Sequence, residues 1–169
     1  KLRYENVKLL YGVIKMLVRK ADLNDLSNII DLWYEMMVFH LNVNDIYRLK
    51  DNAKTIYQSY IEESMKDQKK AIFVCEKQNK VVGYIFAEIN SLPPVYCEGV
   101  TGVITEIGVN ERERKQGIGK LLLDKAEEWF KEQGIYRAEC TVSIDNHLAQ
   151  SFWKKNNYTG YNEICYKYL

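Results

Sequence analysis

One glycine-containing segment, Arg114-Lys115-Gln116-Gly117-Ile118-Gly119-Lys120, holds the residues best suited to chemistry. It joins a β-branched run to an amphipathic helical pattern and so forms a turn at a helix N-terminus. The glycines at positions 117 and 119 remove Cβ obstruction, which lets backbone N–H groups close on an anion, and the helix end adds about half a positive charge. The segment predicts a phosphate-binding turn, although strand-to-helix turns also use glycine for packing.

Two other phosphate-binding loops do not fit this segment. The nucleoside-triphosphate loop ends in Gly-Lys-Ser or Gly-Lys-Thr after a long spacing, and that ending is missing here. The dinucleotide fingerprint needs a third glycine, which is also missing. The turn therefore differs from both.

The elements that position this turn follow from hydrophobic periodicity. Apolar and β-branched runs predict strands at residues 16–20, 71–76, 81–90, 102–109, 137–143 and 162–169. Apolar residues at helical spacing predict helices at residues 26–40, 52–65, 116–133 and 146–155. Polar residues 77–80 suit a hairpin, Gly134 can end a helix in a left-handed cap, and the order of elements across residues 102–155 is typical of a right-handed parallel crossover. We therefore predict an α/β fold with a mixed sheet flanked by helices.

Length and composition are those of one ordinary domain. The 169 residues are 47% hydrophobic, which is enough to bury a core without disulfides or structural metals. We predict a single domain at residues 16–169, preceded by residues 1–15 as an extension of uncertain role or an extra packed element. The 24 Lys and Arg against 23 Asp and Glu give a net charge of +1, which argues against a nucleic-acid partner.

The cysteine and hydropathy patterns indicate the cellular compartment of the protein. The four cysteines are scattered without a C-x-x-C pair, so neither a disulfide framework nor a zinc site is predicted. No apolar run approaches the ~18 residues that span a bilayer, and residues 1–16 carry too many charges for a secretory leader. We expect reduced thiols and a cytoplasmic protein with no membrane partner and no bound metal.

Three segments together resemble the GNAT superfamily of N-acetyltransferases. They are the Arg114-x-x-Gly117-x-Gly119 turn, the preceding strand Glu106-Ile107-Gly108-Val109, and the downstream helix Asn146-x-x-Ala149-x-x-Phe152-Trp153. The resemblance covers roughly residues 16–169 and includes the order of elements. It implies a GNAT-like central mixed sheet that is splayed, acetyl-CoA as the cofactor, and transfer of the acetyl group to a primary amine by direct attack in a ternary complex.

The resemblance also implies where the cofactor lies. Backbone N–H groups across the turn would hold the coenzyme A pyrophosphate, Arg114 and Lys115 would add side-chain charge, and the backbone at Ile107 and Val109 would pair with the pantetheine arm. Asn146 matches a residue that contacts the pantetheine, and it also suits the N-cap of the following helix; the two roles are compatible. The implied cofactor-binding residues are Ile107, Gly108, Val109, Arg114, Lys115, Gln116, Gly117, Ile118, Gly119, Lys120 and Asn146.

The reaction needs a base, because an amine with a pKa of about 10.4 is mostly protonated at neutral pH. Glu106, beside the implied acetyl site, is the candidate base, acting directly or through water; the alternative is a carboxylate that only satisfies a neighbouring polar group. A bulge between Thr105 and Val109 could turn Glu106 away from the acceptor and bring Thr105 towards it. Trp153 stands where many family members carry a tyrosine that protonates the leaving thiolate. Tyr158 fits a core aromatic position of the family. No general acid is therefore assigned.

The resemblance implies that the amine enters over the first two helices, the loop between them and the last strands. Aromatic, acidic and histidine side chains of this region, and of the loop before the fourth strand, would suit a cation: Trp33, Tyr34, His40, Asp45, Tyr47, Tyr96 and Glu98. Trp33 also fits the apolar core stripe of its helix, and His40 suits a helix end.

Several alternatives stay open for the acceptor and for the function. Thr141 and Trp153 stand where ribosomal-protein N-terminal acetyltransferases carry Glu and Tyr, which favours a small-molecule amine over a protein or peptide. A non-catalytic acyl-CoA-binding sensor is the alternative to an enzyme, since the usual tyrosine is missing. An exposed edge on the final strand makes a homodimer plausible.

Overall fold

A computed structural model describes residues 16–169, so the predicted extension at residues 1–15 lies outside the described part of the chain. Within that part, a single mixed sheet has the strand order β1-β2-β3-β4-β5. Its strands are β1 (Met16–Lys20), β2 (Lys70–Lys77), β3 (Lys80–Ser91), β4 (Val100–Val109) and β5 (Ala138–Cys140). The pairs from β1 to β4 are antiparallel and β4 is parallel to β5, which confirms the mixed sheet.

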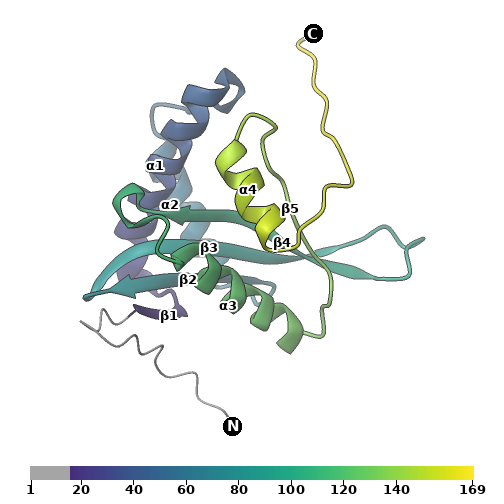
Figure 1. Cartoon of the computed structure of the whole chain (residues 1–169), viewed down its shortest axis with the longest axis horizontal. Helices are drawn as coiled ribbons and strands as arrows, with labels where there is room; N and C mark the ends of the chain where they lie inside the picture. Colours follow the sequence, from purple (N-terminus) through teal and green to yellow (C-terminus); the bar gives the residue numbers. More distant parts are fainter. Residues whose placement is uncertain (1–15) are drawn as a thin grey trace.

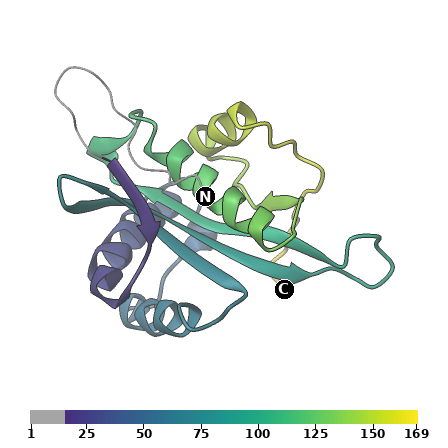
Figure 2. The same ribbon diagram turned by 90° about the horizontal axis from the view of Figure 1, so that it is seen from below.

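The helices cover both faces of the sheet. They are α1 (Leu26–Val43), α2 (Ala53–Ser64), α3 (Ile118–Glu132) and α4 (His147–Lys155). Figure 1 shows the order of elements along the chain, and Figure 2 shows α1 and α2 on one face with α3 and α4 on the other. The four predicted helices are confirmed, with α1 three residues longer than expected because its apolar stripe continues past His40.

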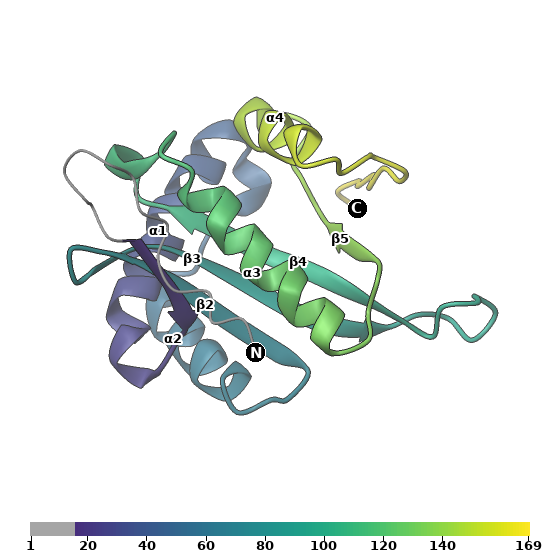
Figure 3. The same cartoon turned by 60° about the horizontal axis from the view of Figure 1, so that its bottom comes forward.

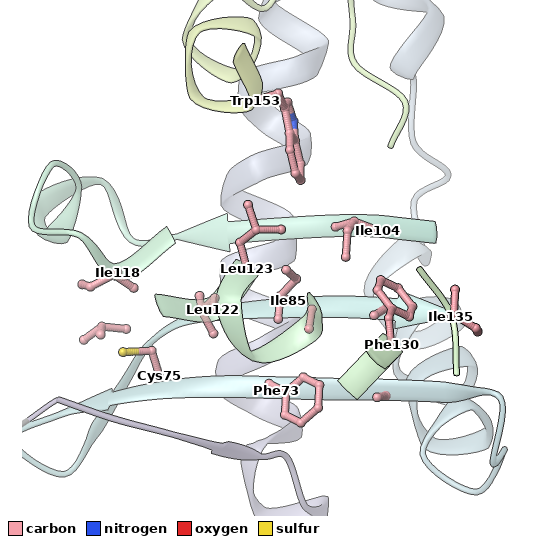
Figure 4. Packing of buried hydrophobic residues seen from close by; sticks show 14 residues of the cluster. Phe73, Cys75, Ile85, Ile104, Ile118, Leu122, Leu123, Phe130, Ile135 and Trp153 are labelled. Carbon is pink, nitrogen blue, oxygen red and sulfur yellow. The ribbon is translucent and has the colours of Figure 1, made fainter. Parts of the chain in front are cut away.

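Each face of the sheet has its own core. Alternating side chains of β3 divide between the two: Ile85 faces α3, whereas Tyr84 and Phe86 face α1 and α2. Figure 4 shows the α3 side, where residues of β2, β3 and β4 meet the apolar stripe of α3 and the indole of Trp153 from α4. Because both faces are buried, the central strands are apolar almost throughout rather than alternating.

Two short turns follow their sequence signals closely. Gln78 and Asn79 both have positive φ values, 51° and 61°, as a two-residue hairpin between β2 and β3 requires. Gly134 has a φ of 74° and follows the end of α3, where its N–H donates to the carbonyl of Lys131. The predicted hairpin and left-handed cap are therefore confirmed.

The predicted final strand at residues 162–169 is wrong. Residues 158–169 have no regular secondary structure, and Ile164 and Tyr168 are exposed. Alternating apolar residues make a strand only where a neighbouring edge accepts their backbone hydrogen bonds, and this segment pairs with no strand of the described chain. A cavity of about 1300 Å³ instead lies between this segment, β5 and α4, and none of residues 107–120 lines it.

β5 is also shorter than the predicted strand at residues 137–143. Its pairing with β4 stops at Cys140, because β4 turns away at that level. No helix within residues 16–169 is long and apolar enough to cross a membrane.

Candidate active site

The sheet opens between β4 and β5. Their parallel pairing begins at Gly102 and ends at Ile104, which pairs with Cys140. In the described chain, the rest of β4 up to Val109 has no strand on that side. The splay predicted near residues 107–109 is therefore confirmed. An open strand edge offers backbone groups to an extended ligand.

A bulge in β4 marks the start of this opening. Phe86 pairs with Glu106 and Ala87 pairs with Ile104, so Thr105 is an extra residue in the ladder. The Thr105 hydroxyl donates to the carbonyl of Phe86 over 3.1 Å. Because a bulge bends its strand and increases the local twist, it accounts for the separation of β4 from β5 beyond this point.

The bulge also determines where Glu106 points. Ile104 belongs to the core under α3, whereas the Glu106 carboxylate contacts Tyr57 of α2 and Tyr84 of β3 on the opposite face. Both hydroxyls donate to Oε2 of Glu106, that of Tyr84 over 2.9 Å. Burial raises the pKa of Glu106, and the two hydrogen bonds oppose this rise. Glu106 thus faces the α1–α2 side, whereas without the bulge it would share the face of Ile104.

The turn between β4 and α3 presents a row of backbone donors. Lys115 and Gly117 both have positive φ values, 63° and 85°. In the described chain, the N–H groups from Lys115 to Lys120 have no backbone acceptor, and Gly117 provides no side-chain cap for α3. Successive free N–H groups at the positive end of a helix form an anion-binding concavity. The turn therefore has the donors that a pyrophosphate needs.

The two glycines of the turn serve different purposes. A Cβ on Gly117 would meet no atom within 4 Å, so this residue is glycine because of its left-handed backbone. A Cβ on Gly119 would lie 3.1 Å from Cε2 of Phe152 and 3.9 Å from Cδ1 of Ile107. Gly119 therefore lets α3 approach α4 beside the open edge of β4. The sequence left open whether this glycine serves packing or phosphate binding, and its position against Phe152 shows a packing role.

Glu35 of α1 holds the start of the turn. Its Oε1 accepts from the N–H of Glu111 at 2.9 Å and lies 3.4 Å from Nη2 of Arg114. Its Oε2 accepts from Nδ2 of Asn110 at 3.4 Å. Arg114 also donates from Nε to the carbonyl of Val109 at 3.0 Å. The Arg114 guanidinium is thus bound to the protein itself, whereas the exposed Lys115 forms no ion pair within residues 16–169.

Lys77 at the end of β2 holds the middle of the turn. Its Nζ lies 2.5 Å from Oε2 of Glu113 and 2.9 Å from Oε1 of Gln116. The side chain of Ile118 is buried in the core, and the ammonium of Lys120 pairs with Asp124. Gln116, Ile118 and Lys120 therefore offer backbone N–H groups rather than side chains to a ligand.

Asn146 joins α4 to the end of α1. Its Oδ1 accepts from the N–H of Ala149 at 3.0 Å, which confirms the predicted N-cap. Its Nδ2 lies 3.2 Å from Nε2 of His40. Burial lowers the pKa of His40, which favours the neutral ring whose Nε2 can accept this hydrogen. The contact brings together residues from the two sides of the open sheet.

The sequence of this fold matches a known family. The sequence model of the Acetyltransferase (GNAT) family matches residues 32–158, which include the bulged strand, the turn and Asn146. The chain belongs to the GNAT family of acetyltransferases. The expected family and fold are thereby confirmed.

Two N-acetyltransferases and one solved acetyltransferase structure are similar to this chain. An uncharacterized N-acetyltransferase of Methanocaldococcus jannaschii is 29% identical over 146 residues, which cover 86% of this chain and 62% of that protein. An N-alpha-acetyltransferase of Sulfurisphaera tokodaii is 32% identical over 112 residues, covering 60% of this chain and 62% of that protein. The chain thus spans about 62% of the length of these two relatives. The crystal structure of a predicted acetyltransferase from Clostridium acetobutylicum with acetyl-CoA has a TM-score of 0.76 at 20% identity, covering 91% of this chain and 96% of that one.

Trp153, which stands at the position of the family's usual tyrosine, and Tyr158 both take part in packing. Trp153 is buried in the α3-side core, as Figure 4 shows. Tyr158 is half-buried with its ring 4.8 Å from that of Trp153, and its hydroxyl donates to Glu127 over 3.2 Å. The expectation that Tyr158 is a core residue is confirmed, and neither residue presents an acidic hydrogen to the open edge of β4.

The residues predicted for the acceptor side do not all lie together. Trp33 is buried against Tyr57, while His40 and Tyr47 are neighbours at the end of α1, with ring centroids 5.1 Å apart. Tyr34 is exposed, and Asp45 pairs with Arg48. Tyr96 and Glu98 lie in the loop between β3 and β4, which projects from the end of the sheet away from α1 (Figures 1 and 3). The structure therefore does not bring those two residues to the α1 surface.

Sequence reasoning missed four polar residues of this site. Glu35 and Lys77 hold the turn, and Tyr57 and Tyr84 bind Glu106. Their partners lie 22 to 79 positions away in the chain, so no local spacing reveals them. For Tyr57 and Tyr84, the only sequence signal is a polar hydroxyl at an otherwise apolar position of α2 and of β3.

Proposed function

We propose that this GNAT protein is an acetyl-CoA-dependent N-acetyltransferase in which Glu106 is the general base toward a primary amine. The observation that carries the proposal is the Glu106 carboxylate, which lies half-buried beside the open edge of β4 with a raised pKa. A base with a pKa nearer neutrality accepts a proton more effectively at physiological pH. The free N–H row of the turn supports cofactor binding at the same end of β4.

The residues present fit acetyl-CoA. The backbone from Lys115 to Lys120 would hold the pyrophosphate, with Lys115 adding charge, and the open edge at residues 107–109 would accept the pantetheine as an added strand. Asn146 would contact the same arm through its amide. When bound, acetyl-CoA supplies an acetyl thioester as the electrophile.

Glu106 then prepares the nucleophile. An ammonium group of the acceptor loses one proton to the carboxylate, directly or through one water, and the free amine nitrogen attacks the thioester carbonyl. The C–N bond forms and the C–S bond breaks, and the leaving thiolate takes the second proton, which the acylated nitrogen loses. No side chain is assigned as the proton donor to sulfur. The row of N–H groups and the strand backbone contribute mainly by position.

A small-molecule amine is the proposed acceptor, since Thr141 and Trp153 replace the Glu and Tyr expected of ribosomal-protein N-terminal acetyltransferases. A protein N-terminus is the second candidate, because the relative from Sulfurisphaera tokodaii is an N-alpha-acetyltransferase at 32% identity. Coenzyme A release from acetyl-CoA should be measured with polyamines, amino acids, aminoglycosides and short peptides. Turnover with only the peptides would transfer the proposal to the second candidate. Cofactor binding without turnover on any amine would indicate a sensor instead.

The role of Glu106 is tested with the confirmed acceptor. Glu106→Gln should keep acetyl-CoA affinity and lower turnover by roughly 10²- to 10⁴-fold, with a smaller loss as pH approaches the pKa of the amine. Glu88→Gln is the matched control, because Glu88 is a half-buried carboxylate of β3 that faces Lys70 rather than the open edge. Wild-type turnover in Glu106→Gln would eliminate Glu106 as the base.

A further inference from the structure

The two oxygens of the Glu106 carboxylate have different surroundings. Oε2 accepts hydrogen bonds from the hydroxyls of both Tyr57 and Tyr84. Burial and the nearby carboxylate raise the pKa of both tyrosines, so both hydroxyls keep their protons and act as donors. One carboxylate oxygen is thereby held from α2 and from β3 at once.

The other oxygen remains available. Within residues 16–169, Oε1 of Glu106 accepts no hydrogen bond from the protein. Every fully buried side-chain oxygen or nitrogen of the described residues has a partner. Since Oε1 has none, it must be accessible from outside. It is the oxygen that a proton-bearing ligand or water can reach.

Packing fixes both tyrosine rings. The indole of Trp33 stacks on Tyr57 with centroids 4.0 Å apart, which holds that ring from the α1 side. The ring of Tyr84 is fully buried and lies over Gly108, where a Cβ would come within 2.6 Å of Cε1 of Tyr84. Gly108 is therefore glycine because the Tyr84 ring needs its space. Neither hydroxyl can follow the carboxylate if Glu106 moves.

We propose that Tyr57 and Tyr84 are positioning residues that hold Oε2 of Glu106 and leave Oε1 as the single proton-accepting oxygen for the acceptor amine. The inference rests on the proposed role of Glu106 as the base. It assigns the direction of approach, because the amine or its bridging water must reach Glu106 from the Oε1 side. It also explains why a tyrosine on α2 and a tyrosine inside the sheet point at one carboxylate.

Hydrogen bonds to a carboxylate stabilise its charged form. From the elements packed around Glu106, the titratable groups that face it are Tyr57 of α2 and Tyr84 of β3, while α1 contributes the uncharged Trp33. The charged Glu35 of α1 is bound to the turn at residues 110–114. Loss of one hydroxyl should therefore raise the pKa of Glu106, by about one unit for a hydrogen bond to a charged group.

The test measures the titration of the Glu106 carboxyl group directly by NMR, and its effect on the reaction through the pH dependence of kcat/KM. The ¹³Cδ signals of glutamate are titrated in the full chain, with the Glu106 signal assigned by its loss in Glu106→Gln. In Tyr57→Phe and in Tyr84→Phe the midpoint for Glu106 should rise by about one unit. The acid limb of kcat/KM should move to higher pH by the same amount, so that kcat/KM on the acid side is lowered and recovers as pH rises. Tyr60→Phe is the control, because Tyr60 lies on α2 beside Tyr57 but binds no carboxylate among the described residues.

The outcomes separate this inference from the proposed function. An unchanged carboxyl midpoint in both folded Phe variants would overturn the positioning role, whatever the rates. A raised midpoint without movement of the rate profile would show that Glu106 is not the base, and the tyrosines would then have no part in the reaction. If Tyr84→Phe unfolds, Tyr57→Phe alone decides.

Discussion

The indole of Trp33 lies almost parallel to the phenol of Tyr57, with an interplanar angle of 7° and centroids 4.0 Å apart. This stack joins α1 to α2 and holds the hydroxyl that binds Glu106. The sequence analysis placed Trp33 both in the core and on the acceptor side. In the structure Trp33 is a core residue, and it supports the site by packing against Tyr57.

Replacing Trp33 should therefore affect stability and activity together. Trp33→Ala removes a side chain that is only 7% exposed, so the free energy of unfolding should fall by about 3–5 kcal/mol. Turnover should also fall, since Tyr57 loses the ring that fixes it. Denaturant unfolding measures the first effect. Tyr34→Ala, at the adjacent exposed position of α1, should change the free energy of unfolding by roughly 0.5 kcal/mol or less. Equal losses in both variants would contradict the stacking role.

Glu35 should influence cofactor affinity from the acceptor-side helix. Glu35→Ala removes the acceptor for the Glu111 N–H and the Arg114 guanidinium. Without these bonds the turn is less ordered in the free protein, and acetyl-CoA binding has to supply the free energy of ordering it. We expect the dissociation constant for acetyl-CoA to rise by about 10-fold, which corresponds to about 1.4 kcal/mol. Calorimetry measures it. Asp31→Ala is the matched control one turn earlier on α1, where an exposed pair with Lys54 contributes little. Unchanged affinity in Glu35→Ala would show that the turn holds its shape without α1.

Gly119 should tolerate a larger side chain only if Phe152 yields. Gly119→Val places a branched side chain against the Phe152 ring, which should lower the melting temperature and weaken acetyl-CoA binding by displacing α4 from the open edge. The double variant Gly119→Val with Phe152→Ala should regain part of both, because the ring that clashes has been removed. A double variant that regains stability but no affinity would mean that the valine blocks the pyrophosphate itself.

The raised pKa of Glu106 predicts a pH-dependent effect on stability. Between the ordinary glutamate pKa and the raised value, the folded chain binds more protons than the unfolded chain, so the free energy of unfolding falls as pH rises through this window. Glu106→Gln has no such group. Its melting temperature relative to wild type should be higher at pH 8 than at pH 4, as thermal scans at both pH values would show. A variant that loses more stability at pH 8 would indicate that the carboxylate is stabilised, not destabilised, by its site.

Local signals in the sequence predicted most of the fold. The positive φ values at Gln78 and Asn79 follow from a short polar turn between two strands, and the helices follow from their apolar stripes. The same signals failed at residues 162–169, where alternation of apolar and polar residues is present but no strand edge pairs with it. A strand depends on a partner that the local sequence does not specify.

The site was predicted where it is continuous in sequence and missed where it is not. The turn at residues 114–120 and the N-cap at Asn146 are local, and both were found. Glu35 and Tyr57 act on residues 76 and 49 positions away, and only the folded sheet brings them to the turn and to Glu106. The cofactor-binding roles stay predictions until a ligand is bound.

The bulge at Thr105 shifts the alternation of side chains between the two faces of β4 by one residue. Residues up to Ile104 alternate in one phase and residues from Glu106 onward alternate in the other. Deleting Thr105 would make the alternation continuous along β4, and every side chain would stay on its present face. Straightening the strand with Thr105 in place would instead move every side chain on one side of Thr105 to the opposite face of the sheet. A relative without the bulge therefore has to be aligned with a gap at this position. Otherwise the carboxylate of one protein is compared with a core residue of the other.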